Sequence, residues 1–103
     1  MAAGTDVVVD HDIEELLGDI TKKLNKKRLM VFNDDHHSQF EVVVAIMRAR
    51  EAAEDPCTPE QATRIMMEAH KTGQGLVMSD GLSKLKKAQE VLDAFGLATD
   101  IID

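Results

Sequence analysis

Apolar residues along the chain form short runs that alternate with stretches of helical periodicity. The runs "RLMVF" (28–32), "GLVMS" (75–79) and "ATDIID" (98–103) predict strands, because Gly, Asn or Asp flank them. Between them, apolar residues three and four apart predict helices that begin after Ser38, after Thr58 and at Asp80. The predicted order is β-α-α-β-α-β. We therefore expect an α+β fold in which a three-stranded antiparallel sheet packs on three helices.

Two of the predicted helices begin with a capping box. Ser38 is followed three residues later by Glu41, and Thr58 by Gln61, with Pro59 at the first helical position. The helix after Ser38 has more apolar residues than one packing face requires. We expect a core stripe and a surplus that could line a pocket; the stripe is Phe40, Val43, Val44 and Met47, and the surplus is Val42, Ala45 and Ile46. In the last helix, Leu82, Leu85, Ala88, Leu92 and Phe95 are expected to point inward.

Residues 1–26 differ from the rest of the chain. The first twelve show no periodicity, whereas "IEELLGDITKKLNKK" carries Ile13, Leu16, Leu17, Ile20 and Leu24 at helical spacing. Gly18 weakens this helix, and Glu, Asp and Lys surround its apolar positions. We predict a flexible N-terminal arm over residues 1–26 that includes an amphipathic helix, and one core domain over residues 27–103.

Composition narrows the class of function. The chain has 103 residues, a formal net charge of −7, and neither Trp nor Tyr. Nucleic-acid binding requires a basic face or aromatic stacking side chains, so we expect no nucleic-acid partner. We expect no membrane association, because no apolar run reaches bilayer length, and we place the protein in the cytoplasm. A lone Cys57 allows no internal disulfide.

The polar stretch "NDDHHS" (33–38) follows a predicted strand and precedes a predicted helix. Asp34, Asp35, His36 and His37 carry groups that bind metals, but neighbours on an extended chain point in opposite directions. Catalysis by Cys57 with a histidine base has even less support, because a lone Cys is usually a small buried apolar residue. We expect no metal, no cofactor and no enzymatic activity. Taken alone, the stretch is typical of a turn that closes on its own backbone.

Two segments together resemble a known family. "KRLMVFNDD" (27–35), combined with "TPEQATRIMMEAHKTG" (58–73), is similar to the ClpS adaptors, which deliver N-degron substrates to the Clp protease. The resemblance covers residues 27–103 and implies the same fold as the periodicity. It also implies that Asn33 and His70 hydrogen-bond the α-amino group of a substrate, while Asp34 favours its positive charge. The implied side-chain pocket is formed by Asp35, His37, Gln39, Val42, Val44, Ala45, Met66 and Ala69.

The resemblance implies a monomeric adaptor with two partners. One is a protein or peptide with a hydrophobic first residue (Phe, Leu, Tyr or Trp). The other is a hexameric Clp AAA+ unfoldase. The resemblance implies that Lys86 contacts this unfoldase and that the N-terminal arm engages it during handover. The chain departs from the family at Gln39, where a Met commonly gates the pocket, and at Gly81, where an acidic residue is usual. Because Gln39, Ala45 and Ala69 are smaller or more polar than the common residues, we expect a roomier pocket. The alternative is a general protein-interaction module of the ribosomal-stalk C-terminal-domain type.

Overall fold

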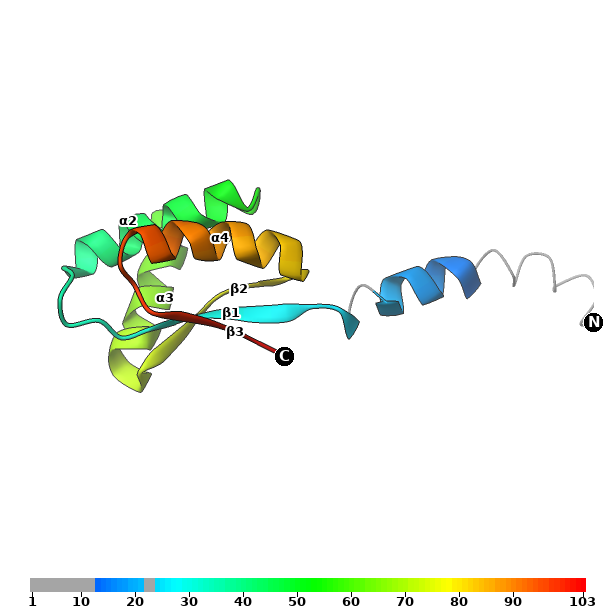
Figure 1. Cartoon of the computed structure of the whole chain (residues 1–103), viewed down its shortest axis with the longest axis horizontal. Coiled ribbons are helices and arrows are strands. Elements are labelled where there is room, and N and C mark those ends of the chain that lie inside the picture. Colours follow the sequence, from blue (N-terminus) through cyan, green and yellow to red (C-terminus); the bar gives the residue numbers. More distant parts are fainter. Residues whose placement is uncertain (1–12, 22–23) are drawn as a thin grey trace, which may run out of the picture.

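The computed structural model describes residues 13–21 and 24–103. Its elements follow the predicted order (Figure 1). They are β1 (Lys27–Phe32), α2 (Gln39–Ala52), α3 (Pro59–Thr72), β2 (Gln74–Asp80), α4 (Leu82–Ala94) and β3 (Thr99–Ile102). The strands form one sheet in the order β2-β1-β3, with both neighbouring pairs antiparallel. This confirms the predicted α+β fold.

Strand β1 is the centre of both the sheet and the core. Leu29 and Val31 are fully buried, and Met30 between them is only 9% exposed, so both faces of β1 are largely covered over these three residues. The register between β1 and β2 shifts between Leu29 and Met30, which leaves Val77 without a partner on β1. This irregularity lets the adjacent residues Val77 and Met78 both be buried, although a regular strand would place them on opposite faces.

The core-facing side of α2 differs from the predicted one. The residues buried on α2 are Val42, Ala45, Ile46 and Ala49. Phe40, predicted to face the core, is 76% exposed, and Val44 is only half-buried. Val43 and Met47, also predicted to face the core, do pack against it. The prediction was wrong at Phe40 and Val44 because residues 42–47 are all apolar, so the sequence is compatible with several rotational settings of the helix about its axis.

The core-facing side of α4 was predicted correctly except at its first residue. Leu85, Ala88 and Leu92 are fully buried, and Phe95 packs against the core just after the helix ends. Leu82, in contrast, is 41% exposed. It begins the helix immediately after the β2–α4 turn, beyond the part of α4 that the other elements cover.

Helix α3 packs directly on the backbone of β2. Gly73 ends the helix in the left-handed conformation with φ of 97°, which glycine adopts without steric cost. The chain then turns into β2, where a Cβ atom on Gly75 would lie 2.5 Å from the carbonyl oxygen of Ile65. Only a residue without a side chain allows this approach, so Gly75 sets the distance between α3 and the sheet.

Residues 13–21 form the predicted amphipathic helix, which Figure 1 shows in blue beyond the N-terminal end of β1. Its apolar residues are exposed, from 41% at Ile20 to 57% at Leu16. Residues 1–12 and 22–23 of the predicted arm lie outside the described residues. Within residues 13–21 and 24–103, no helix has both the length and the apolar character needed to cross a membrane.

Candidate functional site

A small cavity lies between the loop after β1 and the last turns of α3. Its apolar part consists of Val42, Met66 and Ala69, each less than a tenth exposed. Polar side chains surround this part and form what we call the polar rim: Asn33, Asp34, His37, Gln39 and His70. Phe32 completes the lining. The cavity therefore combines an apolar interior with amide, carboxylate and imidazole groups.

Backbone hydrogen bonds bring the two sides of this cavity together. The N–H of Asn33 donates to the carbonyl oxygen of Gly73 at 2.9 Å, which joins the end of β1 to the residue that caps α3. His70 lies one turn before that cap, on the last turn of α3. The N–H of Phe32 donates to the carbonyl of Ala98 at 3.0 Å, which ties the same strand end to the segment before β3. Asn33 and His70 thus meet at one cavity although they are far apart in sequence.

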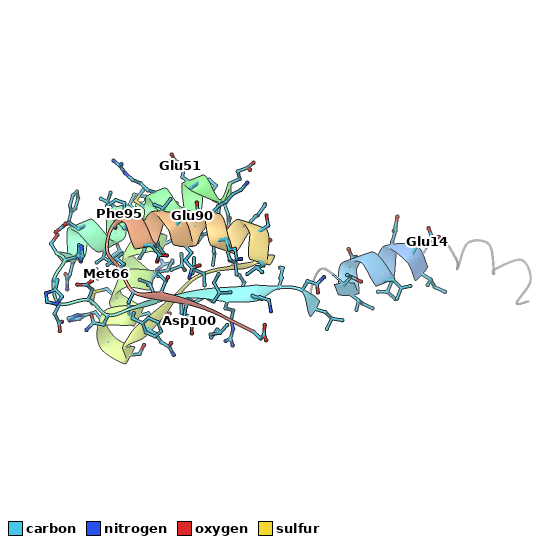
Figure 2. The ribbon with its side chains drawn as sticks, in the orientation of Figure 1. Glu14, Glu51, Met66, Glu90, Phe95 and Asp100 are labelled. Carbon is cyan, nitrogen blue, oxygen red and sulfur yellow. The ribbon has the colours of Figure 1, made fainter. Side chains whose placement is uncertain are left out.

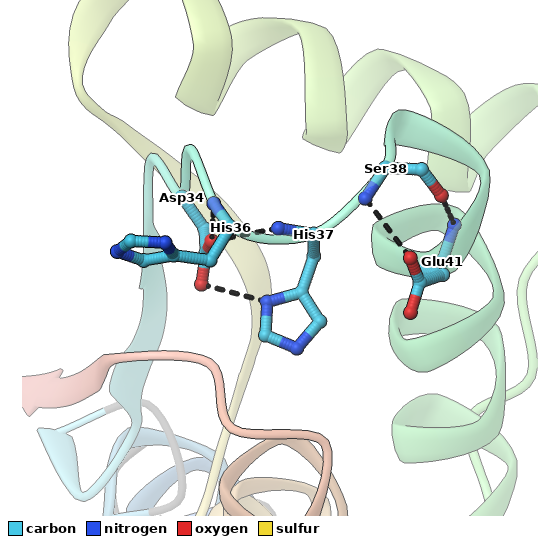
Figure 3. Close-up of polar contacts among 5 residues, drawn as sticks. All are labelled: Asp34, His36, His37, Ser38 and Glu41. Carbon is cyan, nitrogen blue, oxygen red and sulfur yellow. Dashed lines mark hydrogen bonds and ion pairs between the residues drawn. The ribbon is translucent and has the colours of Figure 1, made fainter.

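The carboxylate of Asp34 organises the loop (Figure 3). Its Oδ1 accepts hydrogen bonds from the backbone N–H groups of His36 at 2.6 Å and His37 at 3.0 Å. Its Oδ2 lies 3.0 Å from Nδ1 of His37. These contacts lower the pKa of Asp34 below its usual value, with the N–H of His36 as the largest cause. Asp34 therefore carries its negative charge at neutral pH.

His37 is oriented by the same carboxylate. Because an ionised carboxylate only accepts hydrogen bonds, Nδ1 of His37 carries a hydrogen and donates a hydrogen bond to Oδ2 of Asp34. The opposite edge of the ring faces Gly96, where a Cβ atom would lie 3.4 Å from Cε1 and 3.6 Å from Nε2 of His37. Gly96 has φ of 83°, a conformation that favours glycine. His37 is thus fixed between the loop and the turn after α4.

The predicted capping box at Ser38 is confirmed, and it places the first turn of α2 at the polar rim. The backbone N–H of Ser38 donates to Oε1 of Glu41, and the N–H of Glu41 donates to Oγ of Ser38, both at 3.1 Å (Figure 3). The backbone N–H of Ser38 is the largest cause of a lowered pKa for Glu41. Gln39, the first residue of α2, follows this cap directly and lines the cavity.

The structure brings most of the predicted site residues to the cavity. Those that line it are Asn33, Asp34, His37, Gln39, Val42, Met66, Ala69 and His70. Asp35, Val44 and Ala45 do not. Asp35 is exposed in the loop, Val44 is half-buried on the outer side of α2, and Ala45 is fully buried in the core. The rotational setting of α2 turns Ala45 inward and Val44 outward, whereas Asp35 lies in the loop before this helix.

Phe32 lines the cavity, which the sequence pattern does not predict. It belongs to a run that is expected to be buried, yet it is 36% exposed. Strand alternation is the feature of the sequence that could have predicted this position, because Val31 points into the core and the next residue, Phe32, must then point away from it.

The cavity is small in this structure. Its volume is about 30 Å³, which is about the share of one water molecule in the liquid. Of the three residues behind the expected roomier pocket, Gln39 and Ala69 line the cavity, whereas Ala45 lies in the core. An aromatic side chain can enter only if lining side chains move.

Two further predictions concern residues outside the cavity. Lys86 is an exposed residue of α4 and does not line the cavity. Cys57 is half-buried and packs against the core. Among residues 13–21 and 24–103, no group of three or more His, Cys, Asp and Glu side chains is arranged to hold a metal ion.

A cavity with apolar walls and a rim of amide, carboxylate and imidazole groups, on a small α+β domain, is the candidate binding site. Comparison with known proteins gives the family. Residues 22–99 match the family described as ATP-dependent Clp protease adaptor protein ClpS. The ATP-dependent Clp protease adapter protein ClpS of Synechococcus elongatus is 34% identical over 74 residues, which cover 72% of this chain and 74% of the relative. The chain belongs to the ClpS family, whose members are adaptors of the Clp protease.

A solved structure shows the same fold. Agrobacterium tumefaciens ClpS2 bound to L-phenylalaninamide superposes with a TM-score of 0.61 at 21% identity, over 75% of this chain and 96% of that one. The ligand in that structure has an apolar side chain and a free amino group.

Proposed function

We propose that the cavity binds the first residue of N-degron substrates, namely a free α-amino group followed by a hydrophobic side chain such as that of Phe, Leu, Tyr or Trp. The observation that carries this proposal is the arrangement of the polar rim around an apolar interior. An N-terminal hydrophobic residue is the part of a polypeptide that combines an ammonium group with an apolar side chain on one carbon. The phenylalaninamide bound to Agrobacterium ClpS2 has the same chemistry.

Three residues of the polar rim carry groups suited to an ammonium group, which has three N–H donors. Asn33 contributes an amide oxygen, His70 an imidazole nitrogen without a proton, and Asp34 a carboxylate whose lowered pKa keeps it charged. Hydrogen bonds between charged partners are stronger than neutral ones. Asp34 already accepts three hydrogen bonds from its own loop, so its main contribution to the ligand is electrostatic.

Entry of a side chain requires the cavity to open. Gln39 is the side chain we expect to move, because it is exposed, unbranched and at the end of a helix. Val42, Met66 and Ala69 are buried and remain as the apolar walls. Gln39 thereby takes the position of a gate over the pocket.

We further propose that the adaptor acts as a monomer that passes its substrate to a hexameric Clp AAA+ unfoldase in the cytoplasm, without catalysing a reaction and without a metal or cofactor. Lys86 on the exposed side of α4 would contact the unfoldase. The helix of residues 13–21, with its exposed apolar residues, would engage it during handover.

The test is binding of fluorescent peptides that are identical after the first residue. Peptides that begin with Phe, Leu, Tyr or Trp should bind, those that begin with Gly or Glu should not, and acetylation of the α-amino group should abolish binding. A stalk-type interaction module would instead bind a peptide irrespective of its N-terminus. Equal affinity for the free and acetylated Phe peptides would therefore overturn the proposal.

A further inference from the structure

His37 holds the carboxylate of Asp34 by two separate contacts. The backbone N–H of His37 donates to Oδ1 of Asp34, and Nδ1 of its ring donates to Oδ2, both at 3.0 Å. Both side chains are largely covered: 23% of the His37 side chain and 11% of the Asp34 side chain are exposed. The ring therefore acts on the same carboxylate that gives the polar rim its negative charge.

The turn after α4 limits where the imidazole ring of His37 can lie. This turn begins at Phe95, which Figure 2 labels at the end of α4, and continues through Gly96. A Cβ atom on Gly96 would already touch Cε1 and Nε2 of the ring, so the ring has little room to swing toward the turn. Its Nδ1 edge thus stays beside Asp34.

We infer that His37 is a positioning residue for ligand binding: its uncharged ring holds Asp34 at the polar rim, and protonation of the ring weakens the hold of the rim on an ammonium group. The inference rests on the proposed function, because it requires an ammonium group at the rim. His37 acts through Asp34 in this role and need not touch the ligand.

The effect of protonation follows from the charges of the pair. The uncharged ring carries one N–H, which Asp34 accepts, and the carboxylate keeps its net negative charge. A second proton makes the ring cationic, so its charge offsets that of Asp34 and repels a nearby ammonium group. Histidine is the side chain whose charge ordinarily changes between pH 5 and 8. The ligand and this proton therefore compete for one carboxylate.

Besides Asp34, the titratable groups that face the ring come from the loop, α2 and α3. The loop contributes the exposed side chain of His36. Helix α2 contributes Glu41, whose carboxylate accepts a backbone N–H in the capping box and senses the charge of the ring. Helix α3 contributes His70 at the same cavity, whereas the turn after α4 contributes the uncharged Gly96. Variants of the ring itself keep these groups, so a comparison among such variants isolates its own titration.

The experiment measures the affinity of the full chain and its variants for a fluorescent Phe-initiated peptide at pH 7.5 and 5.5. In His37→Asn the amide nitrogen takes the place of Nδ1 on the γ carbon, so this variant keeps the N–H donor but cannot become charged. It should bind within about twofold of the natural protein at pH 7.5, whereas His37→Ala should raise the Kd about two- to tenfold, the range for one hydrogen bond. On acidification, the Kd of the natural protein should rise about two- to fivefold more than that of His37→Asn.

His36→Ala is the matched control. It removes the neighbouring imidazole but keeps the backbone N–H through which His36 contacts Asp34 (Figure 3). This variant should bind like the natural protein at pH 7.5 and should keep the steeper loss of affinity at pH 5.5.

Two results would overturn the positioning role: a His37→Asn variant that binds as weakly as His37→Ala at pH 7.5, or a ratio of natural to His37→Asn affinity that is the same at both pH values. The second is the outcome expected if His37 only stabilises the loop. The proposed function fails by a different result, equal affinity of the natural protein for the free and the acetylated Phe peptide. An unchanged thermal transition of His37→Asn would verify that this variant folds.

Discussion

The imidazole of His37 and the carboxylate of Asp34 are joined by a 3.0 Å contact from Nδ1 to Oδ2, within a loop whose backbone also donates to that carboxylate. Asp34 thus has two roles in one position. It holds the loop together by accepting hydrogen bonds from the backbone of His36 and His37, and it places a negative charge at the cavity. Substitution of Asp34 should consequently affect both the stability of the domain and the binding of a cationic group.

The first prediction concerns the stability of the fold at acidic pH. The folded-state pKa of Asp34 is lowered from 3.8, so its stabilisation is fully present above pH 3.8 and is lost as the pH falls through the lower folded value. Glu41 and Asp103, whose pKa values are also lowered, add losses of the same sign. Asp34→Asn should be less stable than the natural protein at pH 7 and should lose less stability on acidification. Urea unfolding at pH 7, 5 and 3 measures this; parallel losses in both proteins would contradict it.

The second prediction concerns the ammonium contacts. Asn33→Ala and His70→Ala should each weaken binding of a Phe-initiated peptide by about 1.5–3 kcal/mol, the range for a hydrogen bond to a charged group. This corresponds to a Kd roughly ten- to a hundredfold higher. Lys71→Ala is a control, because Lys71 is adjacent to His70 but does not line the cavity. If either rim variant binds as tightly as Lys71→Ala, that residue does not hold the amine.

The third prediction concerns the gate. Gln39→Met exchanges a polar side chain for an apolar one of similar length, so it should strengthen binding of Leu- and Phe-initiated peptides. A methylene in such a pocket changes discrimination by about 1–3 kcal/mol, so the order among first residues should shift by degrees. Ala45→Leu is the informative contrast. Ala45 is fully buried in the core, so its enlargement should lower the thermal midpoint by overpacking without narrowing the cavity.

The fourth prediction concerns Gly75. A methyl group there would meet the carbonyl oxygen of Ile65, which belongs to the backbone of α3 and cannot rotate away. Gly75→Ala should reduce the free energy of unfolding by about 1–3 kcal/mol and weaken peptide binding, because α3 carries His70. Gly81→Ser is the control, since no atom lies within 4 Å of a Cβ at that position. Denaturant unfolding of both variants measures their free energies of unfolding, and only Gly75→Ala should show the loss.

The fifth prediction concerns the N-terminal arm. Removal of residues 1–26 should leave peptide affinity nearly unchanged, because none of the described residues of this arm, 13–21 and 24–26, lines the cavity. Degradation of an N-degron substrate by the reconstituted unfoldase and peptidase should stop, if the arm is needed for handover. A milder variant, Leu16→Ser with Leu17→Ser, removes exposed apolar surface from the helix of residues 13–21 while preserving its length. Normal delivery by the truncated protein would exclude a role for the arm.

Local signals in the sequence predicted the elements of the fold well. Ser38 with Glu41 and Thr58 with Gln61 mark helix starts because capping is a contact between near neighbours. The rotational setting of α2 was not predictable, since Val42 through Met47 are all apolar. It depends on which side chains of α3, α4 and the sheet fill the space, and this information is spread over the whole chain.

The site was predicted from the resemblance of two segments more than from their chemistry. Alone, residues 33–38 indicate only a turn, and the structure shows that they do form one around Asp34. What makes the turn part of a cavity is distant in sequence: the bond from Asn33 to Gly73 and the close approach permitted by Gly75. Such contacts between separate segments leave no periodic signal.

The hydrogen bond from the N–H of Asn33 to the carbonyl of Gly73 also has a consequence for dynamics. The two sides of the cavity can separate only when this bond breaks, so the amide proton of Asn33 should exchange with solvent at the rate of that local opening. A ligand held between Asn33 and His70 would oppose the opening and slow the exchange. The exchange rate of this single amide proton therefore reports how often the loop moves away from α3, in the free protein and in its complexes.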